Sequence, residues 1–224
     1  ERLESEFARV KAEATPVVYS TLGGVWQGYV GGPDHLVPEA DTAFPKEGLK
    51  NLLVRLSSVP EGFQVHPKLK RFLEARREKA EEKRRAGWAS AEGLAFATLA
   101  VEGHRVRLTG QDALRGTFTQ RHAALYDYRT GERYIPLQHL AEGQAEVEIH
   151  NSPLSEAGVL GFEYGYSLDY PEGLVLWEAQ FGDFVNVAQV YIDQFLASAE
   201  VKWNRLSGLV LLLPHGLEGQ GPEH

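Results

Sequence analysis

The sequence predicts an α/β fold, in which a mainly parallel sheet flanked by helices is preceded by a helical linker. Two observations support this prediction. From residue 105 onward, short apolar segments alternate with longer segments of helical periodicity. This order is typical of parallel sheets, because each parallel connection needs a long crossover. Before residue 105, helical patterns follow one another with a Gly- and Pro-rich stretch between them.

The part before the sheet is predicted to be helical. Helices are expected over residues 1–14, 46–57 and 67–101. The first has one apolar face, formed by Leu3, Phe7 and Val10. The third divides near Gly87 and Trp88, and residues 15–45 form a long connector because Gly and Pro interrupt regular structure.

The part from residue 105 supplies the sheet. Strands are predicted at 106–108, 123–128, 147–149, 174–177 and 209–213. The intervening helices are predicted at 154–168 and 184–200. We therefore divide the chain into an N-terminal helix and connector at 1–47, a helical linker at 48–87 and an α/β domain at 88–224.

Composition excludes several classes of protein. The 23 basic and 31 acidic residues give a net charge of −8, which argues against a nucleic-acid partner. The basic run at 68–85 is interleaved with Glu, as expected for a solvated helix. The absence of cysteine excludes disulfides and thiolate metal sites, and no spacing predicts another metal site. No apolar run approaches the roughly 18 residues of a membrane helix, so we expect no membrane partner.

The ends of the predicted strands direct attention to four segments. Ligands of parallel sheets bind beyond the carboxyl ends of the strands. The segments that follow those ends and carry polar or aromatic side chains are 109–112, 151–156, 178–184 and 214–216. The chain has no Met, and its last residues, 221–224, are typical of a turn rather than of the end of an element, so we expect it to be an internal piece of a longer protein.

Glu156 is the first candidate residue in these segments. Ser152 and Pro153 predict a helix start, as a capping hydroxyl followed by Pro at the first helical position. Glu156 then lies in the first turn, where an acid complements the helix dipole. The alternative is a partly buried carboxylate that faces a ligand nitrogen.

Two further groups of side chains allow two interpretations. Phe181 and Phe184 follow a strand, either as core aromatics or as a stacking wall for a planar heterocycle. His215 and His224 bracket a Gly-rich segment, where they are either structural or part of a site that admits a substrate. In the helix after Glu156, three glycines share one face and predict a close backbone approach, either from a second subunit or from within the domain: Gly158, Gly161 and Gly165.

Four groups of residue strings carry a likeness to a known family. They are 110–112 with 115–118 and 120–123, 154–156 with 161–166, 177–184, and 213–216 with 218–224. These strings, in this order, resemble 2-oxoglutarate dehydrogenases, the first, decarboxylating components of their complexes. The match extends over residues 48–224, and the N-terminal residues 1–47 match more loosely.

The resemblance implies a thiamine diphosphate enzyme whose active site lies between two domains of different subunits. This chain is similar to the pyrimidine-binding domain of such a homodimer. Mg²⁺ and the diphosphate are expected to bind in a domain N-terminal to it, so the chain alone is expected to be inactive. The implied reaction decarboxylates 2-oxoglutarate and transfers the succinyl group to a lipoyl-bearing dihydrolipoyl succinyltransferase. A bacterial, cytoplasmic setting is implied.

The resemblance also implies roles for single residues. Glu156 is expected to hydrogen-bond the far ring nitrogen of the aminopyrimidine and so promote loss of the thiazolium proton. Phe181 and Phe184 are expected to line the pyrimidine pocket. We expect His215 and His224 near the substrate or the lipoyl entrance. We expect Gln111 and Asp112 in the acidic surroundings of the cofactor.

Two departures and two rival functions accompany the resemblance. Val187 and Asn204 stand where the family has Gly, and Val187 adds bulk beside the pocket helix. One rival is the same chemistry on 2-oxoadipate or another 2-oxo acid. The other is a non-catalytic structural relative of the pyrimidine domain.

Overall fold

The sheet of the molecule is parallel, as predicted. The computed structural model describes residues 2–13, 23–33, 35, 37–83 and 85–215. Its main sheet has four strands in the order β4-β1-β5-β6, and every neighbouring pair is parallel. The strands are β1 (Val106–Gly110), β4 (Val147–Asn151), β5 (Leu174–Glu178) and β6 (Val210–Leu212). The predicted α/β class is therefore confirmed.

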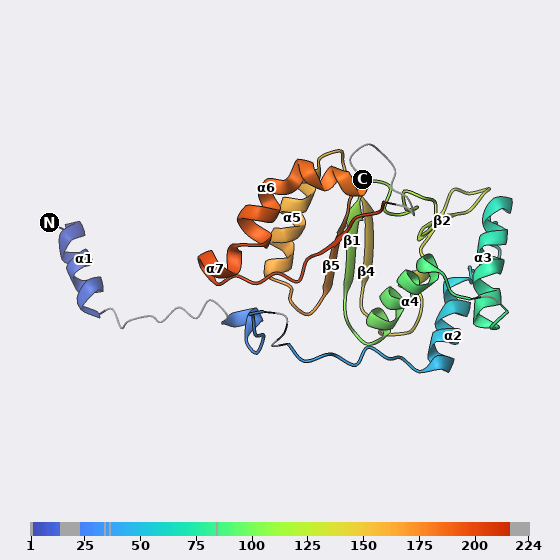
Figure 1. The fold of residues 1–224 in the computed structure, drawn as a ribbon, viewed down its shortest axis with the longest axis horizontal. Helices are drawn as coiled ribbons and strands as arrows, with labels where there is room; N and C mark the ends of the chain where they lie inside the picture. Colours follow the sequence, from blue (N-terminus) through green and yellow to red (C-terminus); the bar gives the residue numbers. More distant parts are fainter. Residues whose placement is uncertain (1, 14–22, 34, 36, 84, 216–224) are drawn as a thin grey trace.

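Helices cover both faces of this sheet (Figure 1). One face carries α2 (Lys46–Leu56) and α4 (Trp88–Val101), and the other carries α5 (Glu156–Leu168) with the helical segments that follow β5. Side chains of β1 alternate between the two faces: Val106 and Leu108 are fully buried in the core under α2 and α4, whereas Arg107 bonds to α5. Burying one such Val or Leu contributes about 1.5–3 kcal/mol.

The linker helices lie where the pattern predicts them. The predicted 67–101 helix is two helices, α3 (Pro67–Ala80) and α4, so the predicted division near Gly87 is confirmed. His66 caps α3 by accepting a hydrogen bond from the Lys68 amide, and Pro at the first position favours the start. α3 packs against α2 and also reaches the β2 region through Leu73 and Leu125.

The prediction of a strand at 123–128 in the parallel sheet is wrong. Only β2 (Leu125–Tyr126) is extended, and it pairs in an antiparallel hairpin with β3 (Arg133–Tyr134), followed by the short helix η3 (Pro136–Gln138). The Asp127 carboxylate accepts the backbone N–H groups of Arg129 and Thr130. This side-chain turn reverses the chain directly after β2.

The predicted helix at 184–200 is broken into four short segments. They are the 3-10 helix η4 (Gly182–Ala188), α6 (Gln189–Tyr191), the π-helix η5 (Ile192–Leu196) and α7 (Ala199–Trp203). α7 ends at Asn204, whose φ of 51° and ψ of 42° are left-handed. Asn is one of the few residues other than Gly that tolerate this conformation.

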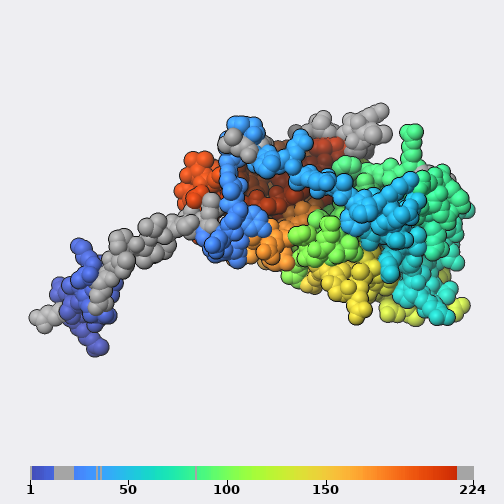
Figure 2. Space-filling model, turned by 90° about the horizontal axis from the view of Figure 1, so that it is seen from below, coloured from blue at the N-terminus to red at the C-terminus, as the bar shows by residue number. Residues whose placement is uncertain are grey.

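The N-terminal part combines a helix with a partly docked connector. The predicted first helix is α1 (Arg2–Glu13), and its apolar residues Leu3 and Phe7 are exposed. The connector contains the short helix η1 (Gly24–Trp26), where Trp26 is buried and donates from Nε1 to the Leu168 carbonyl at 2.5 Å. From η1 the connector crosses the domain to reach α2 (Figures 1 and 2). The domain division at residues 47 and 87 stays a prediction.

Candidate active site at the carboxyl ends of the strands

Glu156 begins α5 and is buried, with 9% of its surface exposed. The helix starts three residues later than Ser152 and Pro153 predict, because Ser155 is the cap and accepts a hydrogen bond from the Gly158 amide at 3.2 Å. A carboxylate at this end of a helix is favoured by the helix dipole. The Nε2 atom of Gln111 donates to Glu156 Oε1 at 2.9 Å.

The segment after β1 reaches the segment after β5. Asp112 has a φ of 55°, and its carboxylate accepts hydrogen bonds from Arg115 at 2.8 Å and from Gln180 Nε2 at 3.1 Å. The hydroxyl of Thr117 donates to the Gln180 carbonyl at 2.7 Å. The loop that begins with Gln111 therefore contacts both α5 and the aromatic segment.

The two predicted aromatic residues share one turn. The amide of Phe184 donates to the Phe181 carbonyl at 3.1 Å. Phe181 is half-buried and meets the ring of Phe118 edge to face, with centroids 6.0 Å apart, whereas Phe184 is 40% exposed. They lie at the start of η4, where the sequence places them after a strand.

His215 lies against the same turn. The Gly182 amide donates to the Pro214 carbonyl at 3.1 Å, and a Cβ atom at Gly182 would lie 2.1 Å from the His215 imidazole. Gly182 is therefore needed for this close approach. His224 lies outside the described residues. Val187 is 59% exposed among the described residues.

A buried charge cluster lies beside this region, and its three members come from separate parts of the chain. Arg121 donates to Glu92 at 2.6 and 2.8 Å and to both carboxylate oxygens of Glu178. Burial lowers the pKa of Arg121, but its hydrogen bonds to Glu92 and Glu178 outweigh burial and raise it. Burial raises the pKa of Glu178, and Arg121 partly offsets this.

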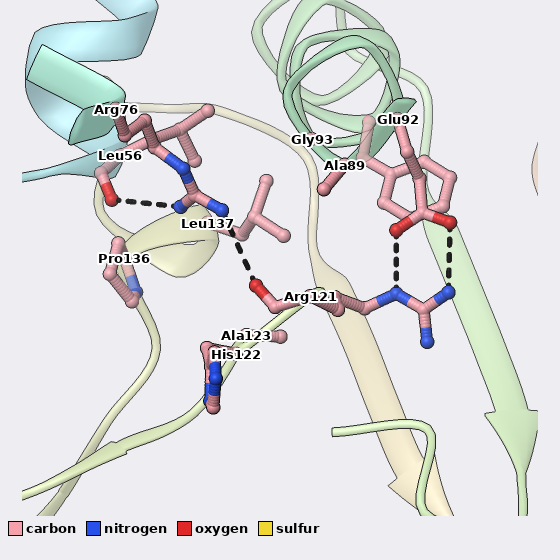
Figure 3. Close-up of a pocket in the computed structure, with 11 residues that line it drawn as sticks. Leu56, Arg76, Ala89, Glu92, Gly93, Arg121, His122, Ala123, Pro136 and Leu137 are labelled. Carbon is pink, nitrogen blue, oxygen red and sulfur yellow. Dashed lines mark hydrogen bonds and ion pairs between the residues drawn. The ribbon is translucent and has the colours of Figure 1, made fainter. Parts of the chain in front are cut away.

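A side chain of the helical linker reaches this cluster by bonding to backbone carbonyl groups. Arg76 of α3 donates to the carbonyls of Leu56 and Arg121 at 3.2 and 3.3 Å, as Figure 3 shows beside the Arg121–Glu92 pair. Burial lowers the pKa of Arg76 to about 10. Arg121 and Glu178 lie in strings that the sequence selected, but Glu92 comes from α4, and no local pattern connects the three residues.

A pocket of about 560 Å³ opens next to the charge cluster. Its lining combines the cluster with apolar residues from β6 and two aromatic side chains: Trp88, Glu92, Phe118, Gln120, Arg121, Glu178 and residues 211–214. Glu156 is not part of this lining. The loop after β1 contributes to both features, through Gln111 at Glu156 and through Phe118 and Arg121 at the pocket.

The glycine face of α5 has an explanation within the chain at one position. A Cβ atom at Gly161 would lie 2.8 Å from the ring of Tyr191 in α6. At Gly158 it would meet only the capping Ser155, and at Gly165 it would meet nothing within 4 Å. Of the two explanations that the sequence left open, packing within the domain therefore accounts for Gly161.

The described residues contain no group of three or more His, Asp or Glu side chains placed to hold a metal ion. No helix in the described part of the chain combines the length and apolar character that a membrane crossing needs.

Comparisons with known proteins identify the domain. Residues 84–224 match the family described as transketolase, pyrimidine binding domain. Over its whole length the chain is 52% identical to the 2-oxoglutarate dehydrogenase E1 components of Brucella ovis and Brucella canis, and 51% identical to that of Brucella melitensis biotype 2. The chain spans 22% of the length of each of these relatives. The resemblance seen in the sequence is confirmed: the chain belongs to the transketolase pyrimidine-binding domain family.

Proposed function

We propose that this chain is the pyrimidine-binding part of a thiamine diphosphate-dependent 2-oxoglutarate dehydrogenase. The family match and the names of the relatives support this proposal. In the whole protein, a homodimer in the cytoplasm, the succinyl group left after decarboxylation passes to a lipoyl group of a dihydrolipoyl succinyltransferase. The diphosphate and Mg²⁺ bind in a domain outside this chain, so the isolated chain is expected to be inactive.

The observation that carries the proposal is the environment of Glu156. Its carboxyl group is buried at the start of α5, on the side of the sheet where ligands of parallel sheets bind. Gln111 holds one carboxylate oxygen at 2.9 Å. Among the residues that the structure describes, none hydrogen-bonds the other oxygen, Oε2. A ring nitrogen of an aminopyrimidine fits such an oxygen, so the residues present suit the cofactor.

The residues of the chain have separate roles in this proposal. Glu156 would hold a proton at its Oε2 atom and share it with the ring nitrogen of a bound aminopyrimidine, as an acid that assists activation of the cofactor. Phe181 and Phe184 form an apolar wall that excludes water from the pyrimidine ring. His215 provides a polar group at the entrance, beside Gly182. When bound, thiamine diphosphate supplies the electron sink for decarboxylation of a 2-oxo acid.

The test uses the full-length protein with Glu156→Gln. An amide is nearly isosteric with a carboxyl group but cannot hold the acidic proton. We expect exchange of the thiazolium proton of bound cofactor with deuterium to slow by about 10²–10⁴-fold. Glu142→Gln, at an exposed glutamate, serves as the matched control and should exchange at the wild-type rate. Wild-type exchange in Glu156→Gln, with cofactor bound, would reduce Glu156 to a helix-dipole residue.

The substrate is tested separately. Full-length protein should release CO₂ from 2-oxoglutarate faster than from 2-oxoadipate, and only with thiamine diphosphate present. A preference for 2-oxoadipate would replace the proposed substrate. Failure to release CO₂ from any 2-oxo acid would favour a structural relative without catalytic activity.

A further inference from the structure

Gln111 has a contact that its sequence neighbourhood does not reveal. Its Nε2 atom donates to Glu156 Oε1, 45 residues further along the chain, at 2.9 Å. A carboxamide neither gains nor loses a proton at ordinary pH, so this group cannot itself serve as an acid or base. It can direct a carboxylate, because the bound oxygen fixes the rotation of the carboxyl group and aims the second oxygen.

The backbone around Gln111 is fixed on both sides. Before it, Gly110 pairs with Asn151 of β4 and Glu178 of β5 in the sheet. A Cβ atom at Gly110 would lie 2.3 Å from the Glu178 carbonyl oxygen, so the two strands approach closely there. The position of Gln111 relative to β5 is therefore set by the sheet.

After Gln111, the chain turns sharply. Asp112 has a φ of 55°, a left-handed conformation that few residues other than Gly adopt. Its side chain is held by Arg115 and by Gln180, at 2.8 and 3.1 Å. Two consecutive side chains thus reach different elements, Gln111 to α5 and Asp112 to the segment after β5.

We propose that Gln111 is a positioning residue that acts through Glu156, rather than a residue that contacts the cofactor. This inference rests on the proposed function of Glu156. A hydrogen bond to a charged group is strong enough that its loss changes an equilibrium by about tenfold to hundredfold. Without the Gln111 donor, Glu156 Oε2 occupies the productive orientation for a correspondingly smaller fraction of the time.

The experiment is a double-mutant cycle in the full-length protein. The variants are Gln111→Met, which keeps the length of the side chain but removes the donor, Glu156→Gln, and both together. Gln64→Met, at a glutamine of the linker, is the control. Three quantities are measured: thiamine diphosphate affinity by calorimetry, exchange of its thiazolium proton, and the Glu156 orientation in crystals of the cofactor-free protein. Gln111→Leu replaces Gln111→Met if the latter does not fold.

The expected result separates orientation from binding. Gln111→Met should slow proton exchange about tenfold to hundredfold while cofactor affinity changes less than threefold. In the Glu156→Gln background it should have no further effect, since residues that act as one unit are not additive. The cofactor-free crystals should show the Glu156 carboxyl group turned or disordered in Gln111→Met and ordered in Gln64→Met.

Two results would overturn the inference. One is additive slowing in the double variant, which would mean that Gln111 acts independently of Glu156. The other is a wild-type exchange rate or an unchanged Glu156 orientation in Gln111→Met. If Glu156→Gln alone exchanges at the wild-type rate, the proposed function fails, and the crystal structures still decide whether Gln111 orients Glu156.

Discussion

Replacing Arg121 with Met should destabilise the domain strongly. The Arg121 side chain is 5% exposed and faces two carboxylates that are also buried, Glu92 at 8% and Glu178 at 2%. It also donates to the Ala113 carbonyl at 2.7 Å. Met fills most of the volume but removes every donor. Both carboxylates then remain buried near each other without the positive charge between them.

The magnitude follows from this geometry. Removing one partner of a buried ion pair typically lowers stability by about 3–5 kcal/mol, because an uncompensated charge stays in the interior. The net contribution of the whole cluster to the stability of the fold is smaller than this loss, because burying three charges is itself unfavourable. The triple variant Arg121→Met, Glu92→Gln, Glu178→Gln should therefore recover most of the loss.

The loss of stability in Arg121→Met should depend on pH. Burial raises the folded-state pKa of Glu178 above its ordinary value, and removal of Arg121 takes away the main group that opposes this rise. A carboxyl group with a raised folded pKa binds more protons folded than unfolded. Its stabilising contribution is present below the unfolded pKa and is lost as pH rises through the folded pKa. The deficit of Arg121→Met should therefore be largest at neutral pH and shrink toward pH ~4.

Hydrogen–deuterium exchange of full-length protein measures this effect locally. Amides of β5 and β1 should lose protection in Arg121→Met by an amount that corresponds to about 3–5 kcal/mol. Arg133→Met, at an exposed arginine of the β2–β3 hairpin, should change protection by less than about 0.5 kcal/mol. Equal protection in Arg121→Met and wild type, or a deficit that grows on acidification, would refute the reasoning.

Two further substitutions test local geometry. Gly161→Leu should lower the free energy of unfolding by about 1–3 kcal/mol through overpacking against Tyr191. Adding Tyr191→Ala should relieve part of this loss in thermal unfolding, and no relief would show that the crowding lies elsewhere. Asn204→Ala should destabilise α7 by about 1 kcal/mol because its φ is 51°, whereas Asn204→Gly should not. Equal hydrogen-exchange protection of α7 in the two variants would contradict this.

The strands of the main sheet could be predicted because short apolar segments mark them, although only the central strands β1 and β5 are buried along most of their length. All four fall where short apolar segments alternate with helical patterns. The failures have local causes that periodicity does not report. The Asp127 carboxylate makes the turn that ends β2, and the 184–200 region contains a π-helix and a 3-10 helix although its apolar spacing suits one helix.

The candidate site could be located from the sequence but not assembled from it. The rule that ligands bind beyond parallel strand ends selected the segments of Gln111, Glu156 and Phe181, and the structure brings these segments close together. The Gln111–Glu156 hydrogen bond depends on sheet register and on the left-handed Asp112, and a propensity argument supplies neither. Arg121, Glu92 and Glu178 meet across three elements, so only the tertiary structure reveals them.

The partners of the buried carboxylates distinguish Glu156 from the others. Arg107 binds both oxygens of Glu163, and Arg121 binds both oxygens of Glu178. Backbone N–H groups occupy both oxygens of Asp127 and lower its pKa to about 2. Each of these carboxylates is already engaged by groups that serve the fold. Glu156 is held at one oxygen by the neutral amide of Gln111, and within the described residues its second oxygen accepts no hydrogen bond. Under the proposed function that oxygen contacts the ring nitrogen, and this unengaged oxygen separates Glu156 from the other three carboxylates.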